Sequence, residues 1–300
     1  MGWLAGCLTH LVRVRLMDIV FLQGAPVLGA LFALGALDEL DWLRAGLLFF
    51  GSICLVAFVF LFNDWADLRL DRNAPTKRGD LFTERGVSPR QMLVFSVLLA
   101  AASLTAMALL SWMALILAAG VALVGLLYSW PAGGAKGLPI ASSAAHLVGQ
   151  FLQFLLGYTL LAEPDLRGLK LAVFFALVFV GGHLNQEVRD HATDRASGIR
   201  TNAVAFGQRP VFLASLVLFT AAFAYLVWLA LSDTVARETA YLVVLYPVYA
   251  IACWRAYAAG LGFASAIRLR LVYRLIFAAI GAGIVAIRLC ELLLERGAAV

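Results

Sequence analysis

Nine stretches of apolar residues, each about long enough to cross a lipid bilayer, constrain the fold of this chain more than any other feature. A bilayer core takes about 20 apolar residues of helix. The segment from residue 91 to residue 135 is uncharged, and as one helix it would be about 67 Å long, about twice the core thickness. It is therefore predicted to turn back near Ser111. The expected spans are 19–37, 45–62, 92–110, 113–128, 138–162, 169–186, 211–231, 240–257 and 271–294.

Composition agrees with a chain that lies mostly in lipid. Hydrophobic residues make up 63% of the chain, charged residues 14%, and the mean hydropathy is +0.92. A soluble chain would carry closer to a quarter charged residues. We therefore predict an all-α membrane protein, with nine transmembrane helices in one domain over residues 1–300. The four cysteines show no paired spacing, so neither disulfides nor a zinc site is expected.

The distribution of Lys and Arg predicts how the chain is oriented in the membrane. With nine spans, seventeen of the 23 basic residues fall in the connections on one side, and six fall on the other. The positive-inside rule places the basic side, with the N-terminus, in the cytoplasm and the C-terminus across the membrane. We expect a multi-pass protein of a plasma membrane of the bacterial inner-membrane type.

The segment from Asn63 to Asp80 follows the second span and is rich in charge. Its acids Asp64, Asp67 and Asp71 are spaced by three and then four residues, so on a helix they share one face. Like charges on one face repel each other, and a cation such as Mg²⁺, which prefers oxygen ligands, would remove that repulsion. The alternative is a solvated helix end where the chain meets water.

A second segment repeats this pattern near the end of the sixth span. Glu187, Asp190 and Asp194 have the same spacing, and Gln186 precedes them as Asn63 precedes the first set. The two segments divide the domain into two halves that resemble each other, with motifs at 63–71 and 187–194. Because both sets are predicted at the same side of the membrane, they could face each other and hold metal ions between them.

Further polar residues near these motifs have open interpretations. Lys136 is the only charged residue from position 91 to position 162, and it is either functional or a helix-end lysine reaching the headgroups. His146, Gln150 and Gln153 share one face of the fifth span, where they could line an acceptor pocket or bond neighbouring helices. Arg15 could pair with Asp18 or bind a polyanion. Basic residues beside the motifs could likewise bind a polyanion or reflect only the positive-inside bias; they are Arg15, Arg72, Lys77, Arg78, Lys136 and Arg195.

These motifs resemble those of the UbiA superfamily of intramembrane prenyltransferases. The first signature, NDxxDxxxD, matches at Asn63, Asp64, Asp67 and Asp71. The second, DxxDxxxDxxxGxxT, is similar to the sequence at Glu187, Asp190, Asp194, Gly198 and Thr201, with Glu in the first position. Tyr128 and Ser129 followed by Lys136 resemble the YS…K segment of the family. The usual Arg-Pro after the first signature is replaced by Lys77-Arg78-Gly79.

The resemblance implies a helical bundle around a central cavity that is open to lipid. It implies two Mg²⁺ ions that bridge a prenyl diphosphate, with ligands among Asn63, Asp64, Asp67, Asp71, Glu187, Asp190 and Asp194. It further implies that Arg72, Lys77 and Lys136 bind the diphosphate and that Tyr128 faces the developing cation. Asp67, Asp190, Asp194, Tyr128 and Lys136 are then the expected catalytic residues.

The expected reaction is Mg²⁺-dependent transfer of a prenyl group from a polyprenyl diphosphate to a small, aromatic acceptor. A terpene cyclase on the same fold is the alternative, because the cation could attack its own tail. A transporter or cation channel fits less well, since its acids are expected at the membrane midplane rather than at one face. Membrane lipid is an expected partner and nucleic acid is not. The sequence predicts no oligomeric state.

Overall fold

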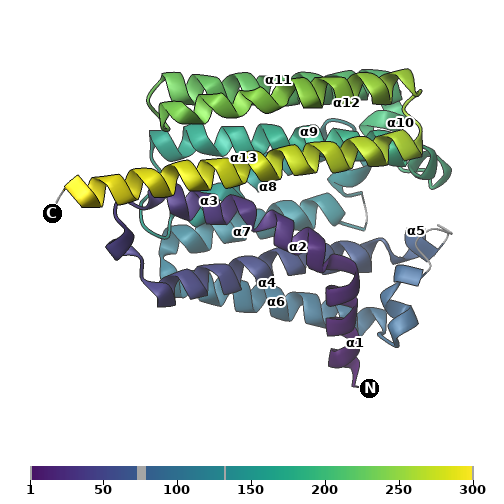
Figure 1. The fold of residues 1–300 in the computed structure, drawn as a ribbon. Coiled ribbons are helices and arrows are strands. Elements are labelled where there is room, and N and C mark those ends of the chain that lie inside the picture. The colour runs from purple at the N-terminus through teal and green to yellow at the C-terminus, as the bar shows by residue number, and fades with distance from the viewer. Residues whose placement is uncertain (1, 73–78, 132, 299–300) are drawn as a thin grey trace.

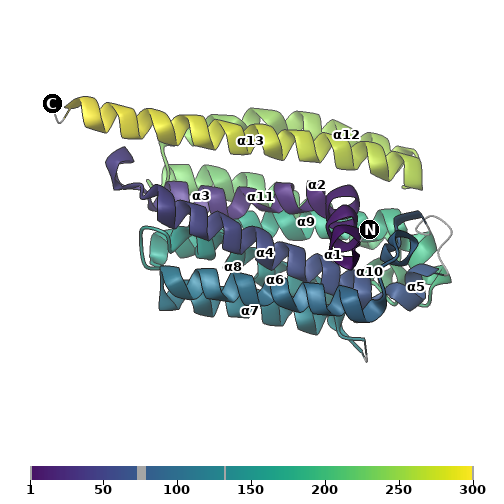
Figure 2. The same ribbon diagram turned by 90° about the horizontal axis from the view of Figure 1, so that it is seen from below.

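The computed structural model describes residues 2–72, 79–131 and 133–298, and within these residues the secondary structure is entirely helical. The long helices lie roughly side by side (Figure 1), and the N- and C-terminal ends lie at opposite ends of the bundle (Figures 1 and 2). The α-helices are α1 (Trp3–His10), α2 (Leu16–Leu22), α3 (Gly24–Ala33), α4 (Trp42–Ala66), α5 (Leu68–Arg72), α6 (Pro89–Leu110), α7 (Trp112–Ser129), α8 (Ala141–Tyr158), α9 (Leu166–Ala196), α10 (Asn202–Phe206), α11 (Gln208–Leu231), α12 (Tyr246–Ala258) and α13 (Phe263–Ala298).

Eight helical segments of the described chain are long and apolar enough to span a membrane. The remaining predicted span, the fifth (138–162), corresponds to α8, which is 18 residues long and packs against α3, α7 and α9. This helix is less apolar than the other eight because it carries His146, Gln150 and Gln153, and burial among its neighbours shields these side chains from lipid. The predicted helical membrane bundle is therefore confirmed, with eight helices in the described chain that qualify by length and composition and a ninth, α8, that packs among them.

Local sequence explains where several helices begin and end. The Ser88 hydroxyl accepts a hydrogen bond from the Gln91 backbone N–H, and the Gln91 side chain accepts one from the Ser88 N–H, so α6 begins with a capping box. Ser111 ends α6 and caps α7, where its hydroxyl accepts a bond from the Ala114 N–H. The predicted hairpin turn at Ser111 is thus confirmed.

The N-terminal segment differs from the expected simple first span. It is helical from Trp3 to Ala33, but a π-helical turn at Leu11–Arg15 separates α1 from α2. Helix α1 lies across the end of the bundle rather than along it (Figures 1 and 2). Its buried Cys7 packs with Phe82 and Met92 in a small cluster of their own. The segment therefore covers the end at which the first acidic motif emerges.

Close contact between α3 and α8 determines the shape of the bundle centre. A Cβ at Gly157 would lie 2.0 Å from the Pro26 carbonyl oxygen, and a Cβ at Gly29 would lie 2.2 Å from the Phe154 carbonyl oxygen. Two backbones can approach this closely only where both helices present glycine. The crossing holds α8 against α3 and leaves the opposite face of α3 free to line a cavity.

The two acidic motifs are carried to the same end of the bundle. Helix α5, which carries Asp71 of the first motif, and α10, which follows the second motif, lie at that end in both views (Figures 1 and 2). The first motif runs from the end of α4 into α5, and the second lies at the end of α9. The resemblance between two halves of the chain stays a prediction, and so does the side of the membrane on which this end lies.

Candidate active site

A cavity of about 940 Å³ lies among the N-terminal segment, α4, α9 and α13. Its charged end is lined by Asn63, Asp64 and Asp71 of the first motif and by Gln186 and Asp190 of the second. The remainder is largely apolar, with lining residues that include Phe60, Phe174, Phe175, Phe179, Phe277 and Ile284. Two motifs more than a hundred residues apart in the sequence therefore share one cavity.

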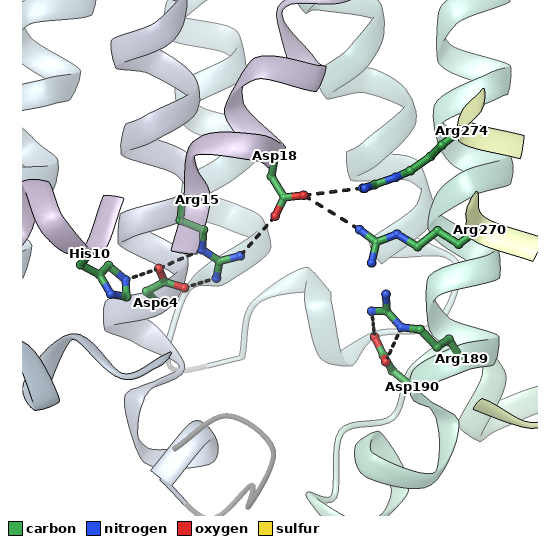
Figure 3. A network of polar contacts seen from close by, with 8 residues as sticks. All are labelled: His10, Arg15, Asp18, Asp64, Arg189, Asp190, Arg270 and Arg274. Atoms are coloured by element: carbon green, nitrogen blue, oxygen red, sulfur yellow. Dashed lines mark hydrogen bonds and ion pairs between the residues drawn. The ribbon is translucent and has the colours of Figure 1, made fainter. Parts of the chain in front are cut away.

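Asp64 is the most tightly held acid of the first motif. Its carboxylate lies 2.9 Å from His10 Nε2 and 3.0 Å from Arg15 Nε, and a second Arg15 nitrogen also donates to it (Figure 3). The π-helical turn just after His10 adds a residue to the helix, and both His10 and Arg15 reach the same carboxylate across it. A buried carboxylate needs such partners because removing it from water is costly.

The neighbouring residues of the first motif connect it to the segment that follows α7. The Asn63 side-chain amide donates to the Ser129 hydroxyl at 3.0 Å. Asp67 forms an ion pair with Lys136, which lies on a short 3-10 helix at Ala135–Gly137. The structure thus joins Ser129 and Lys136 to the first acidic motif, although 66 and 69 residues separate the partners.

The second motif divides between the cavity and the surrounding structure. Asp190 faces the cavity and accepts a hydrogen bond from Arg189 Nε at 2.7 Å. Asp194 lies outside the cavity lining, and its backbone carbonyl accepts a 2.9 Å bond from the Ile199 N–H. Gly198 adopts φ +71°, a left-handed conformation that suits glycine and ends α9. The glycine of the second signature therefore has a structural role.

Glu187 was predicted to assist in metal binding, but the structure places it in the packing among α8, α9 and α10. Its carboxylate is buried and accepts bonds at 3.1 Å from Ser142 and Asn202 and at 3.3 Å from the Ala203 N–H. His183 Nε2 lies 3.1 Å away as a further partner. These contacts involve both carboxylate oxygens and support a positioning role, while the expected part of Glu187 in metal binding stays a prediction.

Replacing Glu187 tests that role through stability. Glu187→Ala should lower the free energy of unfolding by about 3–5 kcal/mol, because it leaves several buried donors without an acceptor. Thermal unfolding in detergent measures the effect. Glu84→Gln alters an exposed acid near the same end that forms no ion pair among the described residues, so it serves as the control and should unfold like the unaltered protein. Equal stability of the Glu187 variant would contradict the positioning role.

The three candidate acceptor-pocket residues are not equivalent. His146 and Gln150 line the cavity, whereas the Gln153 side chain donates to Ser52 at 3.3 Å and joins two helices. His146 stacks on His183 with ring centroids 3.7 Å apart, and Tyr128 meets its edge at 4.8 Å. Tyr128 therefore contacts the wall of the cavity through His146 rather than lining it directly.

The predicted diphosphate-binding residues also lie in different places. Arg15 lines the cavity and Lys136 pairs with Asp67, as described above. Arg72 and Arg195 are exposed beyond the cavity lining, at the ends of α5 and α9. Two further candidates, Lys77 and Arg78, lie outside the described residues.

Several charged residues at the cavity were not identified as site residues from the sequence. Asp18, which was expected to pair with Arg15, lies 3.9 Å from it and also 3.9 Å from Arg270 and 3.6 Å from Arg274 (Figure 3). Arg270 and Arg274 are four residues apart and so share one face of α13. The four-residue spacing was the feature of the sequence from which a shared basic face could have been predicted. It could not show that this face of α13 lies against α2.

The donor chemistry of the cavity suits Mg²⁺. Asn63, Asp64, Asp71, Gln186 and Asp190 offer only hard oxygen ligands, which this ion prefers. In the arrangement described, Asp64 and Asp190 are held in ion pairs, and no group of three His, Cys, Asp or Glu side chains in the described chain is gathered closely enough to hold a metal. The motifs converge on one cavity, and the expected ligand set stays a prediction.

Comparison with solved structures shows that this fold is known. A UbiA homologue from Archaeoglobus fulgidus, bound to DMAPP and Mg²⁺, superposes with a TM-score of 0.70 at 17% identity, covering 93% of this chain and 99% of that one. An apo UbiA homologue from Aeropyrum pernix K1 gives a TM-score of 0.69 at 21% identity, covering 91% and 98%. At these identities the likeness establishes the fold.

Sequence comparison establishes the family. The chain is 31% identical over 238 residues to a digeranylgeranylglyceryl phosphate synthase from Methanothrix thermoacetophila, covering 77% of this chain and 85% of the relative. The model of the UbiA prenyltransferase family matches residues 24–266, which include both acidic motifs. The chain therefore belongs to the UbiA prenyltransferase family and is a multi-pass membrane enzyme.

Proposed function

We propose that this protein transfers a prenyl group from a prenyl diphosphate, in a Mg²⁺-dependent reaction, to a small acceptor that enters the same cavity. The observation that carries the proposal is the single cavity with two contrasting parts. Asp64, Asp71 and Asp190 line one end, and aromatic and aliphatic side chains line the rest. A diphosphate with an apolar tail has the same two parts.

The charged end would receive the diphosphate. Asn63, Asp64, Asp67, Asp71, Asp190 and Asp194 are the proposed residues for holding two Mg²⁺ ions. When bound, Mg²⁺ would stabilise the charge of the leaving diphosphate. Lys136, held against Asp67, and Arg15, held against Asp64, would add positive charge at fixed positions. Their ion pairs keep both side chains near the acids before substrate binds.

The apolar part would hold the prenyl tail and protect the reacting carbon from water. Phe60, Phe179 and Phe277 line this part from α4, α9 and α13. Aromatic ring faces attract cations, so such a lining would stabilise an allylic carbocation while supplying no nucleophile. His146 and Gln150 are the polar groups on its wall, and they support a place for an acceptor beside the tail.

The chemical class of the acceptor is a separate and more specific part of the proposal. The sequence led us to expect an aromatic acceptor, whereas the similar archaeal synthase is named for a glyceryl phosphate product. An aromatic acceptor and a glyceryl phosphate acceptor would each bring a nucleophilic oxygen or carbon to the carbocation. We retain transfer to a small acceptor as the proposal. We further propose that the protein lies in a plasma membrane of the bacterial type, with the basic end that bears both motifs on the cytoplasmic side.

Incubating the purified protein with prenyl diphosphates of graded length tests the proposal. Diphosphate release should require Mg²⁺ and stop when EDTA removes the ion. With a panel of aromatic and glyceryl phosphate acceptors, mass spectrometry should find a prenylated acceptor. A cyclic hydrocarbon or alcohol formed without acceptor would instead indicate a terpene cyclase. No consumption of any donor, together with ion flux in liposomes, would favour a transporter.

A further inference from the structure

Three arginines gather on the α9 and α13 side of the cavity. Arg189, Arg270 and Arg274 all line it, and Figure 3 shows them on the side opposite His10, Arg15 and Asp64. None of the three belongs to either acidic signature or to the predicted diphosphate-binding set. Helix α13 contributes no motif residue, so the function proposed above gives Arg270 and Arg274 no role.

The three arginines differ in how well nearby acids satisfy them, because Arg189 is paired with an acid and Arg270 and Arg274 are not closely paired. Arg189 directs two nitrogens at Asp190. Among the residues that the structure describes, Asp18 is the one acid paired with Arg270 and Arg274, at 3.9 and 3.6 Å, beyond the usual length of a hydrogen bond. Asp18 is further shared with Arg15.

The surroundings of Arg270 and Arg274 offer little other compensation. Arg270 Nε is buried and has no hydrogen-bond partner in the described part of the chain, and the Arg274 guanidinium lies over the Phe21 ring at 5.0 Å. Guanidinium groups that are partly removed from water need an anion to offset the cost. The fork of donors on each arginine matches the oxygens of a phosphate or a carboxylate.

We infer that Arg270 and Arg274, together with Arg189, form a second anion-binding subsite that takes the phosphate or carboxylate group of the acceptor. The inference rests on the proposed function and deepens it, because it predicts an anionic acceptor. A prenyl diphosphate has one charged end, and the acidic motifs with Lys136 are proposed to receive it. A second cluster of cations, across the cavity from Arg15 and Asp64, supports a second charged group.

Ligand binding without turnover tests the subsite directly. An alkylglycerol phosphate and 4-hydroxybenzoate would be the phosphate and carboxylate probes, with the uncharged alkylglycerol as the contrast. One or both anions, but not the alkylglycerol, should raise the thermal unfolding temperature of the unaltered protein. The shift should disappear in Arg270→Gln/Arg274→Gln and persist in Arg268→Gln, which removes an exposed arginine of the same helix. An equal shift in both variants would overturn the inference.

Steady-state kinetics separates acceptor binding from donor binding. In Arg270→Gln/Arg274→Gln, the KM for the anionic acceptor should rise about 10- to 100-fold, the range expected for lost charged hydrogen bonds. The KM for the donor should stay within about twofold of the unaltered value, as a subsite for the acceptor alone requires. A matching rise in the donor KM would assign these arginines to the diphosphate and overturn the inference. If the unaltered protein released no diphosphate in the presence of Mg²⁺, the proposed function would be refuted. The binding measurement would still decide whether the anion subsite exists.

Discussion

Asp67→Asn and Asp190→Asn should each lower Mg²⁺-dependent diphosphate release by at least about 100-fold while leaving the protein folded. Each variant removes a negative charge but keeps nearly the same side-chain volume. Removing one group that stabilises transition-state charge typically costs about 10²–10³ in rate. Single-turnover release of labelled diphosphate, with Mg²⁺ varied, measures the loss.

The two acids test different elements of the same site. Asp67 pairs with Lys136 beside the cavity, and Asp190 lines the cavity with Arg189 as its partner. If both hold the metal-bound diphosphate, the two variants should lose activity together and should need more Mg²⁺. Asp38→Asn alters an exposed acid outside the cavity lining and should keep full activity. Full turnover by both site variants would contradict the proposal that these acids hold the metal-bound diphosphate.

Gly157→Ala is expected to lower the free energy of unfolding by about 3 kcal/mol. A Cβ at this position would lie 2.0 Å from the Pro26 carbonyl oxygen and 2.5 Å from the Pro26 Cα. Backbone atoms of another helix cannot rotate away as a side chain can, so α3 and α8 would have to separate. Unfolding followed by circular dichroism in detergent micelles measures the loss.

Gly46→Ala is the matched control for that variant. Gly46 also lies in a membrane helix, α4, but a Cβ there meets no atom within 4 Å. Alanine favours the helix over glycine by about 1 kcal/mol, so this variant should be as stable as the unaltered protein or slightly more so. If Gly157→Ala were equally well tolerated, the close crossing of α3 and α8 would not be a determinant of the bundle.

Much of the fold was predictable because membrane helices are specified locally. The length of an apolar run determines whether it can cross the bilayer, and a hydroxyl or glycine at its end can stop it. The Ser88 cap, the turn at Ser111 and the paired acidic motifs depend on residues only a few positions apart. The first span was less predictable, because no residue pattern within Leu11–Arg15 indicates the π-helical turn that changes the direction of α1.

The candidate site shows the limit of local information. The residue spacing predicted that Asp64, Asp67 and Asp71 share one helix face. It also predicted that Glu187 is the equivalent of Asp64 in the second motif. Only the folded chain distinguishes them, because Asp64 lines the cavity while Glu187 receives its bonds from α8, α9 and α10. A helical repeat states which residues share a face, but it does not state what that face meets.

The sequence by itself determined the membrane-spanning helices, the ends of several of them and the two acidic motifs that carry the family resemblance. These features follow from hydropathy and from contacts within one or two helical turns. The tertiary structure alone decided that His10 reaches Asp64, 54 residues away, and that Arg274 lies 3.6 Å from Asp18 across the cavity. Such pairs depend on how α1, α4 and α13 pack, and packing arises from the sum of many distant contacts that no single stretch of sequence contains.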